Sequence, residues 1–246
     1  MTPYMTDLHR FVNSPVPVTP YLIMIDKHME KFELYYSLLV EWNQRFNLTA
    51  ITERDEVFAR HFEDSLAAAD YIKEGAYVCD IGSGAGFPGL PLKIVRPDLN
   101  VVLFDSVNKK IAFLNEVISR LGLSGIEAVH SRAEDAAALN RYRERFGVAV
   151  CRAVAPLPVL CEYALPLIKV GGNFIAYKTE AAVETETASV QNALKILNGK
   201  ITDVIPYSLK EKNGGEIKLA LIIIEKTALC PLKYPRGGNK PRLNPL

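Results

Sequence analysis

The sequence predicts a Rossmann-like α/β fold, with a seven-stranded, mostly parallel sheet and helices on both faces. Three observations predict it. Short apolar runs alternate with helical patterns through residues 76–177, and the first run ends in a glycine-rich turn at residues 80–89. Two more strand-like runs, at residues 201–207 and 217–224, flank the turn signal Asn213-Gly214-Gly215. Alternating units favour a parallel sheet, and the closing pair favours antiparallel pairing.

The N-terminal part is predicted to be an irregular leader followed by helices. Residues 1–20 are interrupted by prolines, namely Pro3, Pro15, Pro17 and Pro20. From Tyr21 to Phe46, apolar residues recur every three or four positions, which indicates an amphipathic helix broken once near residue 30. Thr52 and Asp55 have the spacing of a capping box, so a second helix is predicted to run to about Ile72. We therefore expect a leader over residues 1–20 and a helical extension over residues 21–73.

The main domain is expected over residues 74–230, with a basic tail over residues 231–246. Its five parallel strands are predicted at residues 76–81, 100–105, 126–130, 147–151 and 172–177. The helices between them are predicted at residues 88–95, 107–121, 133–139 and 157–168, with a further helical stretch over 179–197. This order, closed by the antiparallel pair, is the plan of a class I methyltransferase, whereas a dinucleotide-binding fold more often ends with a sixth parallel strand.

Composition limits the class of protein. The chain has 246 residues, 49% of them hydrophobic and 23% charged, which is typical of a soluble globular enzyme. The net charge of +1 indicates that any nucleic-acid surface is local. We expect a cytoplasmic protein, because there is no membrane-spanning run and no signal-peptide pattern. Four cysteines lack metal-site spacing and are expected to be reduced structural thiols: Cys79, Cys151, Cys161 and Cys230.

The glycine-rich turn is expected to bind a ligand. The spacing Gly84-x-Gly86-x-x-Gly89 matches the dinucleotide fingerprint, but alone that match is weak. Asp80, just before the loop, would repel a pyrophosphate and attract an ammonium group such as that of S-adenosylmethionine (SAM). Asp105 ends the next strand-like run and supplies a second acid, for ribose hydroxyls. The pattern favours SAM over NAD, and either ligand over a tight turn with no ligand.

A second polar group lies on the helix predicted after Thr52. His61, Asp64 and Ser65 fall within one turn of each other. A hydrolytic triad is one interpretation, but the strand elbow that exposes a nucleophilic serine is missing. A solvated helix face is the favoured interpretation, and the polar rim of a cofactor pocket is intermediate between the two.

The acceptor of the methyl group can be narrowed from the residues after the fourth strand. Enzymes that methylate exocyclic base amines commonly place an Asn/Asp-Pro-Pro-aromatic run there, and residues 150–156 do not fit it. Methylation of cytosine C5 needs a thiolate, and Cys151 lacks the usual adjacent proline. Guanine N7 has an in-plane lone pair and needs neither a general base nor a covalent step, so orientation can supply most of the rate. The missing motifs therefore favour guanine N7.

With these residues in view, the chain resembles the bacterial small-subunit rRNA guanine-N7 methyltransferases, the GidB family, over about residues 30–246. The motifs that carry the resemblance are Trp42-Asn43 with Asn47-Leu48-Thr49, His61-Phe62-x-Asp64-Ser65, Asp80 through Gly89, Asp105-Ser106, Arg132-Ala133-Glu134, Arg152-Ala153-Val154-Ala155, and Tyr234-Pro235-Arg236 with Pro245-Leu246. Cys151 stands where the family usually has serine, and Thr179 where it usually has glycine.

The resemblance implies a SAM-dependent enzyme that methylates N7 of a guanine in 16S rRNA, with the small ribosomal subunit or its rRNA as partner, no metal and a monomeric state. It implies that Arg152 orients the reactants and that no general base is needed. Together with the two acids at the strand ends, Asp80 and Asp105, the expected cofactor contacts are Gly82, Gly84, Phe87, Ser106, Ala133, Glu134 and Arg152. The alternatives are an NAD-dependent oxidoreductase and a non-catalytic SAM- or ribosome-binding assembly factor.

The tail is expected to contact RNA. Four cations and no acid lie in residues 231–246: Lys233, Arg236, Lys240 and Arg242. They form either a solvated terminus or an arm that follows a phosphate backbone, and we expect RNA contact for these four and for Lys178. The alternative for the apolar tail residues Tyr234, Leu243 and Leu246 is packing back onto the domain, which we expect for at least one of them.

Overall fold

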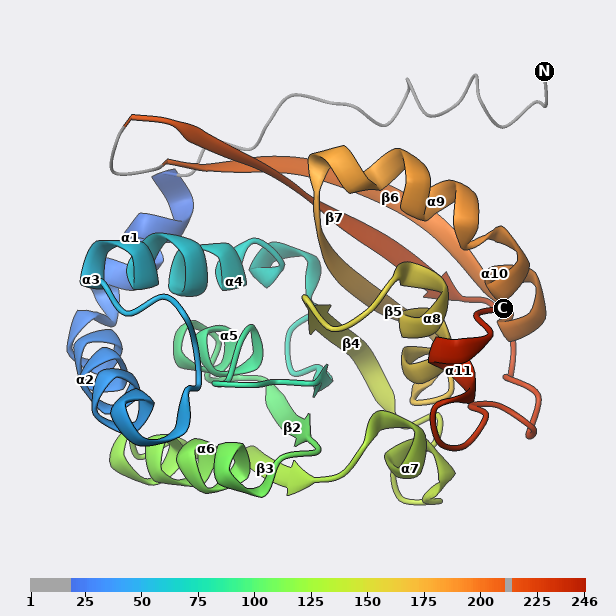
Figure 1. The fold of residues 1–246 in the computed structure, drawn as a ribbon, viewed down its shortest axis with the longest axis horizontal. Coiled ribbons are helices and arrows are strands. Elements are labelled where there is room, and N and C mark those ends of the chain that lie inside the picture. The colour runs from blue at the N-terminus through green and yellow to red at the C-terminus, as the bar shows by residue number, and fades with distance from the viewer. Residues whose placement is uncertain (1–18, 211–213) are drawn as a thin grey trace.

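The computed structural model describes residues 19–210 and 214–246, and it confirms the predicted α/β architecture (Figure 1). Its seven-stranded sheet has the order β3-β2-β1-β4-β5-β7-β6. Strands β1 to β5 are parallel, and β7 pairs antiparallel with both β5 and β6. The strands are β1 Tyr77–Ile81, β2 Asn100–Asp105, β3 Ile126–His130, β4 Phe146–Arg152, β5 Ile168–Thr179, β6 Gly199–Lys210 and β7 Glu216–Lys226.

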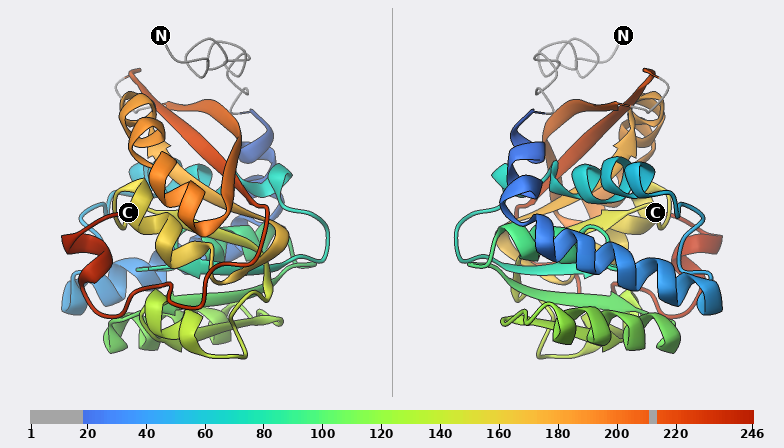
Figure 2. Two further views of the ribbon diagram at one scale, coloured as in Figure 1. Left: turned by 90° about the vertical axis from the view of Figure 1, so that its right-hand side faces the viewer. Right: turned by 90° about the vertical axis from the view of Figure 1, so that its left-hand side faces the viewer.

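Helices cover both faces of this sheet (Figure 2). They are α1 Thr19–Lys27, α2 Met29–Phe46, α3 Arg54–Val57, the π-helical turn η2 Phe58–Glu63, α4 Asp64–Leu66, η3 Ala69–Tyr71, α5 Gly89–Val95, α6 Asn108–Arg120, α7 Ala133–Ala138, α8 Leu157–Ala164, η4 Glu180–Ala182, α9 Val183–Ser189, α10 Gln191–Leu197 and α11 Lys240–Leu243. Most predicted bounds hold to within a few residues.

The structure confirms the predicted break in the N-terminal helices but places one helix cap at a different residue. The break near residue 30 is confirmed, because α1 and α2 are separated at His28. The cap predicted at Thr52 is wrong: Glu53 is the N-cap of α3, and its side chain accepts a hydrogen bond from the Glu56 backbone N–H. The predicted leader lies outside the described residues up to position 18, and α1 already begins at Thr19. The predicted loop residue Asn213 also lies outside them.

Two buried clusters lie on opposite faces of the sheet. One combines side chains of α1, α2, η2, α5 and α6 with one face of the strands, and the other combines α7, α8 and α10 with the opposite face. Helix α2 can bury one face in the first cluster because its buried residues recur at helical spacing: Phe32, Tyr35, Leu38 and Leu39. The Tyr35 hydroxyl also donates a hydrogen bond to the carbonyl of Ala85 in the glycine loop. The N-terminal helices therefore support that loop directly.

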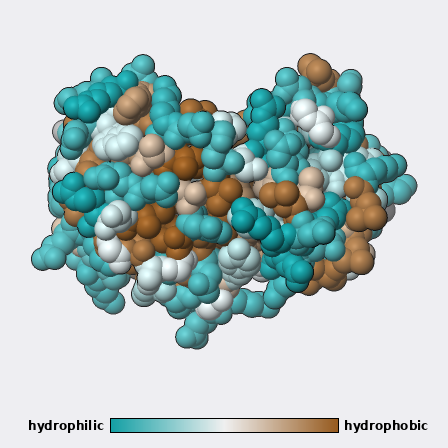
Figure 3. Space-filling model, turned by 90° about the horizontal axis from the view of Figure 1, so that it is seen from below, coloured by the Kyte–Doolittle hydropathy of each residue, from teal (hydrophilic) through white to brown (hydrophobic). Residues whose placement is uncertain are grey.

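The parallel register brings the polar strand ends to one edge. Asp105 at the end of β2 pairs with His130 of β3, and Arg152 at the end of β4 pairs with Tyr177 of β5. Ligands of open α/β sheets bind at this carboxyl edge. No helix in residues 19–210 or 214–246 is long and apolar enough to cross a membrane. The face in Figure 3 is mainly hydrophilic, with hydrophobic residues exposed between hydrophilic ones.

Candidate active site

The glycine loop follows β1 and needs glycine for two physical reasons. Gly82, Gly84 and Gly86 have φ angles of 71°, 60° and 101°, a region that L side chains rarely adopt. A Cβ on Gly82 would also lie 2.7 Å from Cγ2 of Val154. The backbone N–H groups of Gly82 and Ser83 donate to the carbonyl of Phe104, which ties the loop to β2. The loop is thus held with its backbone close to the end of β4.

Asp80 lies behind this loop rather than in a cavity. It is fully buried, and its Oδ2 accepts a hydrogen bond of 2.8 Å from the backbone N–H of Gly89, the first residue of α5. Its Oδ1 has no hydrogen-bond partner among the described residues. Burial raises the pKa of Asp80 to about 7. The predicted contact with an ammonium group therefore depends on Oδ1 and stays a prediction.

Asp105 is held by the backbone around it. Its Oδ2 accepts from the Gly84 N–H at 2.9 Å and its Oδ1 from the Val107 N–H at 2.9 Å, while Lys110 Nζ lies 3.7 Å away. Each carboxylate oxygen has two lone pairs, so both can accept a further hydrogen bond. Asp105 is thus oriented with acceptor capacity left over.

A first cavity, of about 340 Å³, opens beside Asp105 at the carboxyl ends of β1, β2 and β3. Five predicted cofactor contacts line it, namely Gly82, Asp105, Ser106, Ala133 and Glu134. The rest of its wall consists of Ile81, Phe104, Ser131, Arg132, Val154, Tyr163, Asn239 and Arg242. Burial raises the pKa of Glu134. Four predicted contacts, Asp80, Gly84, Phe87 and Arg152, are not among the lining residues.

Phe87 stands instead in an aromatic stack behind the loop. Its ring centroid lies 4.5 Å from that of His61 and 5.6 Å from that of Tyr35, and the Arg152 guanidinium lies 5.1 Å from the ring. Phe87 therefore joins the loop to the N-terminal helices and to the end of β4.

Arg152 is the centre of a buried polar network. Its Nη1 donates to Asp64 Oδ2 at 2.6 Å and to the Arg60 carbonyl at 2.9 Å, and its Nη2 lies 3.1 Å from His61 Nδ1. The Tyr207 hydroxyl donates to the other Asp64 oxygen at 2.6 Å. The side chains of Arg152 and Asp64 are 15% and 9% exposed, so this is a largely desolvated ion pair. Asp64 thus joins β4, β6 and the N-terminal helices.

His61 is fixed as a neutral imidazole. Burial, together with the charge of Arg152, lowers its pKa to about 3. Nδ1 lies 3.1 Å from Arg152 Nη2, which can only donate, and 3.1 Å from the Arg60 carbonyl, which can only accept, while Nε2 lies 2.8 Å from Thr49 Oγ1, so both ring nitrogens have a partner in either tautomer. Ser65 is fully buried, and its hydroxyl donates to the His61 carbonyl. The residues therefore do not form a hydrolytic triad, because the Ser65 hydroxyl bonds to the His61 carbonyl and not to its ring.

The favoured interpretation of a solvated helix face is wrong as well. Phe62, Glu63, Asp64 and Ser65 are consecutive and all buried. The intermediate interpretation is the polar rim of a cofactor pocket. His61 and Asp64 do line a second cavity, but it is separate from the one lined by five of the predicted cofactor contacts.

This second cavity has a volume of about 480 Å³. It is lined by Ile51, Arg60, His61, Asp64, Arg152, Ala153, Tyr177, Lys178, Thr179, Ala182, Glu186, Tyr207, Leu209, Ile217 and Leu219. Lys178 Nζ donates to Glu186 Oε1 at 2.7 Å and to the Ala155 carbonyl at 3.0 Å. In this structure Lys178 therefore braces the cavity wall rather than projecting outward. Sequence reasoning missed Glu186 and Tyr207, since both lie far from any motif.

The turn at residues 152–155 separates the two cavities. Ala153 lines the second cavity and Val154 the first. Ala153 adopts a φ of 56°, which is unusual for a residue with a Cβ and costs backbone strain. The two cavities therefore meet on either side of one short, strained turn.

The tail folds onto the body, so the predicted free arm is corrected in part. Arg236 makes a two-pronged ion pair with the fully buried Glu162, Nε to Oε1 at 2.8 Å and Nη2 to Oε2 at 2.7 Å. Arg242 lines the first cavity. Lys233 and Lys240 are exposed. Tyr234 packs into the core and Leu246 against it, whereas Leu243 is exposed.

The cysteines behave as expected. All four are free and buried. Cys151 donates through its thiol to the Ile81 carbonyl, and burial raises its pKa well above the ordinary range. In residues 19–210 and 214–246 no three His, Cys, Asp or Glu side chains are grouped to hold a metal ion.

Known proteins resemble this chain closely. The GidB family, described as rRNA small subunit methyltransferase G, matches residues 28–213. Ribosomal RNA small subunit methyltransferase G of Acetivibrio thermocellus is 47% identical over 222 residues, 90% of each chain. The protein of the same name from a Thermoanaerobacter species is 49% identical over 225 residues, 89% of this chain and 90% of that one. The crystal structure of M. jannaschii TYW2 in complex with AdoMet has a TM-score of 0.54 at 14% identity, covers 68% of this chain and 76% of its own, and shows the shared fold.

Proposed function

Because the chain belongs to the GidB family of small-subunit rRNA methyltransferases, we propose that it transfers a methyl group from SAM to N7 of a guanine in 16S rRNA, acting as a monomeric cytoplasmic enzyme. The observation that carries the proposal is the pair of cavities on either side of the 152–155 turn. A transfer between two bound molecules needs two sites that meet, with the reacting atoms close together.

The first cavity suits SAM by its donors and acceptors. Asp105 has free acceptor capacity for a ribose diol, and Gly82 lets a ligand approach the backbone closely. Ala133 and Glu134 line the β3 side, where we place the adenine. Asp80 does not line this cavity, and the contact of its buried Oδ1 atom with the ammonium group stays a prediction. When bound, SAM supplies the methyl group, whose bond to sulfur breaks as the guanine N7 lone pair forms the new bond to carbon.

The second cavity suits a base that needs orientation and no proton transfer. Arg152 and His61 are both locked by hydrogen bonds, and both ring nitrogens of the neutral His61 have hydrogen-bond partners. Cys151 is buried and protonated, so it is no nucleophile for a C5 mechanism. The positive charge passes from sulfur to the purine, so no proton needs to be removed. We therefore assign Arg152 a positioning role through Asp64 and Phe87.

Methyl transfer to isolated ribosomal subunits tests the proposal. The purified chain is incubated with SAM carrying a tritiated methyl group and with small subunits, or naked 16S rRNA, from cells that lack the family's enzyme. We expect tritium in 16S rRNA, recovered as 7-methylguanosine when the nucleosides are separated by chromatography and compared with methylguanosine standards. Asp105→Ala is the matched control and should lose transfer through weaker SAM binding.

Two outcomes would replace the proposal. SAM binding without methyl incorporation into subunits or rRNA would favour a non-catalytic assembly factor. Tighter binding of NAD than of SAM by equilibrium dialysis would favour an oxidoreductase. A tritiated product other than 7-methylguanosine would keep the methyltransferase and overturn the choice of N7.

A further inference from the structure

The last part of the chain forms a wall of the first cavity. We call residues 227–246 the C-terminal strap. After β7 the strap starts near the amino ends of β4 and β5, where Arg143 and Glu144 hold it, and its short helix α11 lies beside α8 (Figure 1). Asn239 and Arg242 of the strap line the cavity together with residues of β1, β2 and the β3–α7 connection. The cavity is therefore incomplete without the strap.

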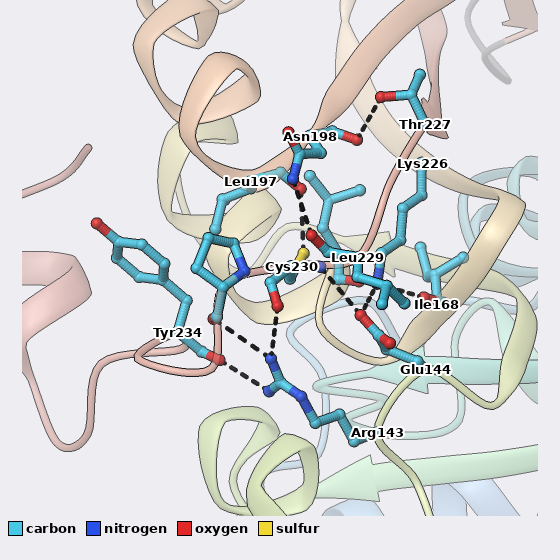
Figure 4. A network of polar contacts seen from close by, with 12 residues as sticks. Arg143, Glu144, Ile168, Leu197, Asn198, Lys226, Thr227, Leu229, Cys230 and Tyr234 are labelled. Atoms are coloured by element: carbon cyan, nitrogen blue, oxygen red, sulfur yellow. Dashed lines mark hydrogen bonds and ion pairs between the residues drawn. The ribbon is translucent and has the colours of Figure 1, made fainter.

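The first half of the strap is fixed by many polar contacts (Figure 4). Arg143 donates to the carbonyls of Tyr234 and Cys230, and Asn198 donates to that of Leu229. Glu144 accepts from the Cys230 backbone N–H and from the buried ammonium group of Lys226. This half of the strap has a defined path over the sheet.

The second half depends on one buried carboxylate. Glu162 is fully buried in α8 and holds Arg236 by two side-chain hydrogen bonds and by the Arg236 backbone N–H. Arg236 in turn donates to the Asn244 carbonyl at 2.8 Å, which closes the segment around α11. Arg242 is thereby presented to the cavity from a braced short helix.

Arg242 faces the part of the cavity next to the glycine loop. Its Nη2 lies 3.4 Å from the Val154 carbonyl, and Val154 is the residue that a Cβ on Gly82 would strike. The other cation that lines the cavity is Arg132, which pairs with Glu134 at 3.8 Å on the β3 side. The charges of both arginines act on Glu134, but of the two only Arg242 also contacts the Val154 carbonyl, in the turn beside Gly82.

We propose that the strap completes the cofactor site and that Arg242 binds the carboxylate of the cofactor's amino-acid end. This inference rests on the proposed function, in that it takes SAM as the ligand. That end of SAM carries a carboxylate that needs a cation, and the loop around Gly82 is where we place it. A guanidinium suits a carboxylate because its planar N–H groups can donate two parallel hydrogen bonds. Arg242 is thereby a cofactor-binding residue and not an RNA contact.

Two ligands that differ at this end test the proposal. S-Adenosylhomocysteine keeps the carboxylate, and 5′-methylthioadenosine lacks the whole amino-acid group. Both are titrated by calorimetry into the full chain and into Arg242→Gln. We expect Arg242→Gln to weaken S-adenosylhomocysteine about tenfold, as when a charge-assisted hydrogen bond near solvent is removed, and to change 5′-methylthioadenosine less than about twofold. Lys240→Gln removes one charge from the same helix without lining the cavity and should leave both affinities unchanged.

The outcomes separate the carboxylate contact from the activity itself. If the unmodified chain binds neither ligand, the proposed function fails and this inference with it. If it binds both, and Arg242→Gln weakens both equally or neither, the carboxylate assignment alone is overturned. Limited trypsin digestion gives a second measurement when it is followed at the bond between Arg236 and the exposed Gly237, because Lys240 precedes a proline and Arg242→Gln removes its own cleavage site. S-Adenosylhomocysteine should slow cleavage of the strap in the unmodified chain more than in Arg242→Gln, and equal protection would contradict the contact.

Discussion

The two cavities beside the 152–155 turn are built in different ways. The first depends on backbone: glycines with positive φ shape its loop, and Asp105 is held by two N–H groups. The second depends on side chains, joined through one ion pair between Arg152 and Asp64. The difference indicates that substitutions should damage them differently, through conformational strain in the first and through uncompensated charge in the second.

The largest effect is expected from Asp64→Ala, which removes the ion pair that holds the second cavity together. It leaves the Arg152 guanidinium and the Tyr207 hydroxyl without their buried partner, so the free energy of unfolding should fall by about 3–5 kcal/mol. Chemical denaturation measures this. Glu33→Ala is the matched control, because the Arg54–Glu33 pair is 44% and 40% exposed and its loss should cost only about 0–1 kcal/mol. A tenfold loss of SAM affinity in the folded Asp64→Ala variant would show that the two regions are not independent.

The next effect is expected from Gly82→Ala, which strains the first region. Gly82 and Gly75 have similar φ angles of 71° and 66°, but only Gly82 has a side chain within 4 Å of the added Cβ. Alanine should cost about 1–2 kcal/mol at Gly75 from the backbone alone and about 1–3 kcal/mol more at Gly82 from the clash. Thermal unfolding of the two variants tests the difference. Equal losses would mean that Val154 moves aside without cost.

A smaller, pH-dependent effect is expected from Asp80, behind the loop. Burial raises its pKa to about 7 in the folded chain, above its unfolded value of about 3.9, so the folded state holds more protons between these values. The stability that this proton contributes is present below pH 4 and is lost as the pH rises through 7. Relative to Asp80→Asn, the unmodified chain should therefore lose about 2.5 kcal/mol of unfolding free energy between pH 5 and pH 8.

Denaturation of both proteins across that range measures the Asp80 effect. Taking the difference removes the contribution of Glu63, whose pKa is also raised to about 7 by burial and by Asp64. A difference that stays constant with pH would mean that Asp80 is ionised in the folded chain.

The smallest effect on the molecule itself is expected from Lys233→Glu with Lys240→Glu, which lie outside both regions. These exposed residues should leave stability within about 0.5 kcal/mol and SAM affinity unchanged. If they contact rRNA, the slope of log affinity for the small subunit against log salt should flatten by about 0.7 for each phosphate that is no longer bound. Lys27→Glu with Lys195→Glu makes the same charge change elsewhere on the surface. Equal slopes for both pairs would reject an RNA role for the tail lysines.

The sequence predicted the fold well, because it follows from local strand and helix patterns, but it predicted only part of the first cavity, whose wall includes the distant Asn239 and Arg242. Strand alternation and the glycine spacing are local signals, and five predicted contacts line the cavity. Arg236 was misassigned because its partner Glu162 is 74 positions away, and charge alone does not reveal pairing. The polar face at His61 was misassigned for another reason. The π-helical turn Phe58–Glu63 puts more residues in each turn than the α-helical period assumes, so the next residues rotate inward.

The hydrogen bond from Tyr207 to Asp64 joins residues 143 positions apart, whereas that from Gly84 to Asp105 spans 21. Closing the longer loop costs more chain entropy, so the contact between Gly84 and Asp105 should form earlier during folding than the contact between Tyr207 and Asp64. We expect the glycine loop to become ordered while Asp64 is still solvated. Asp64→Ala should then leave the refolding rate nearly unchanged and speed unfolding, because its contacts are absent from the transition state. The second cavity, where we place the guanine, would then be the last part of the molecule to assemble and the first to open.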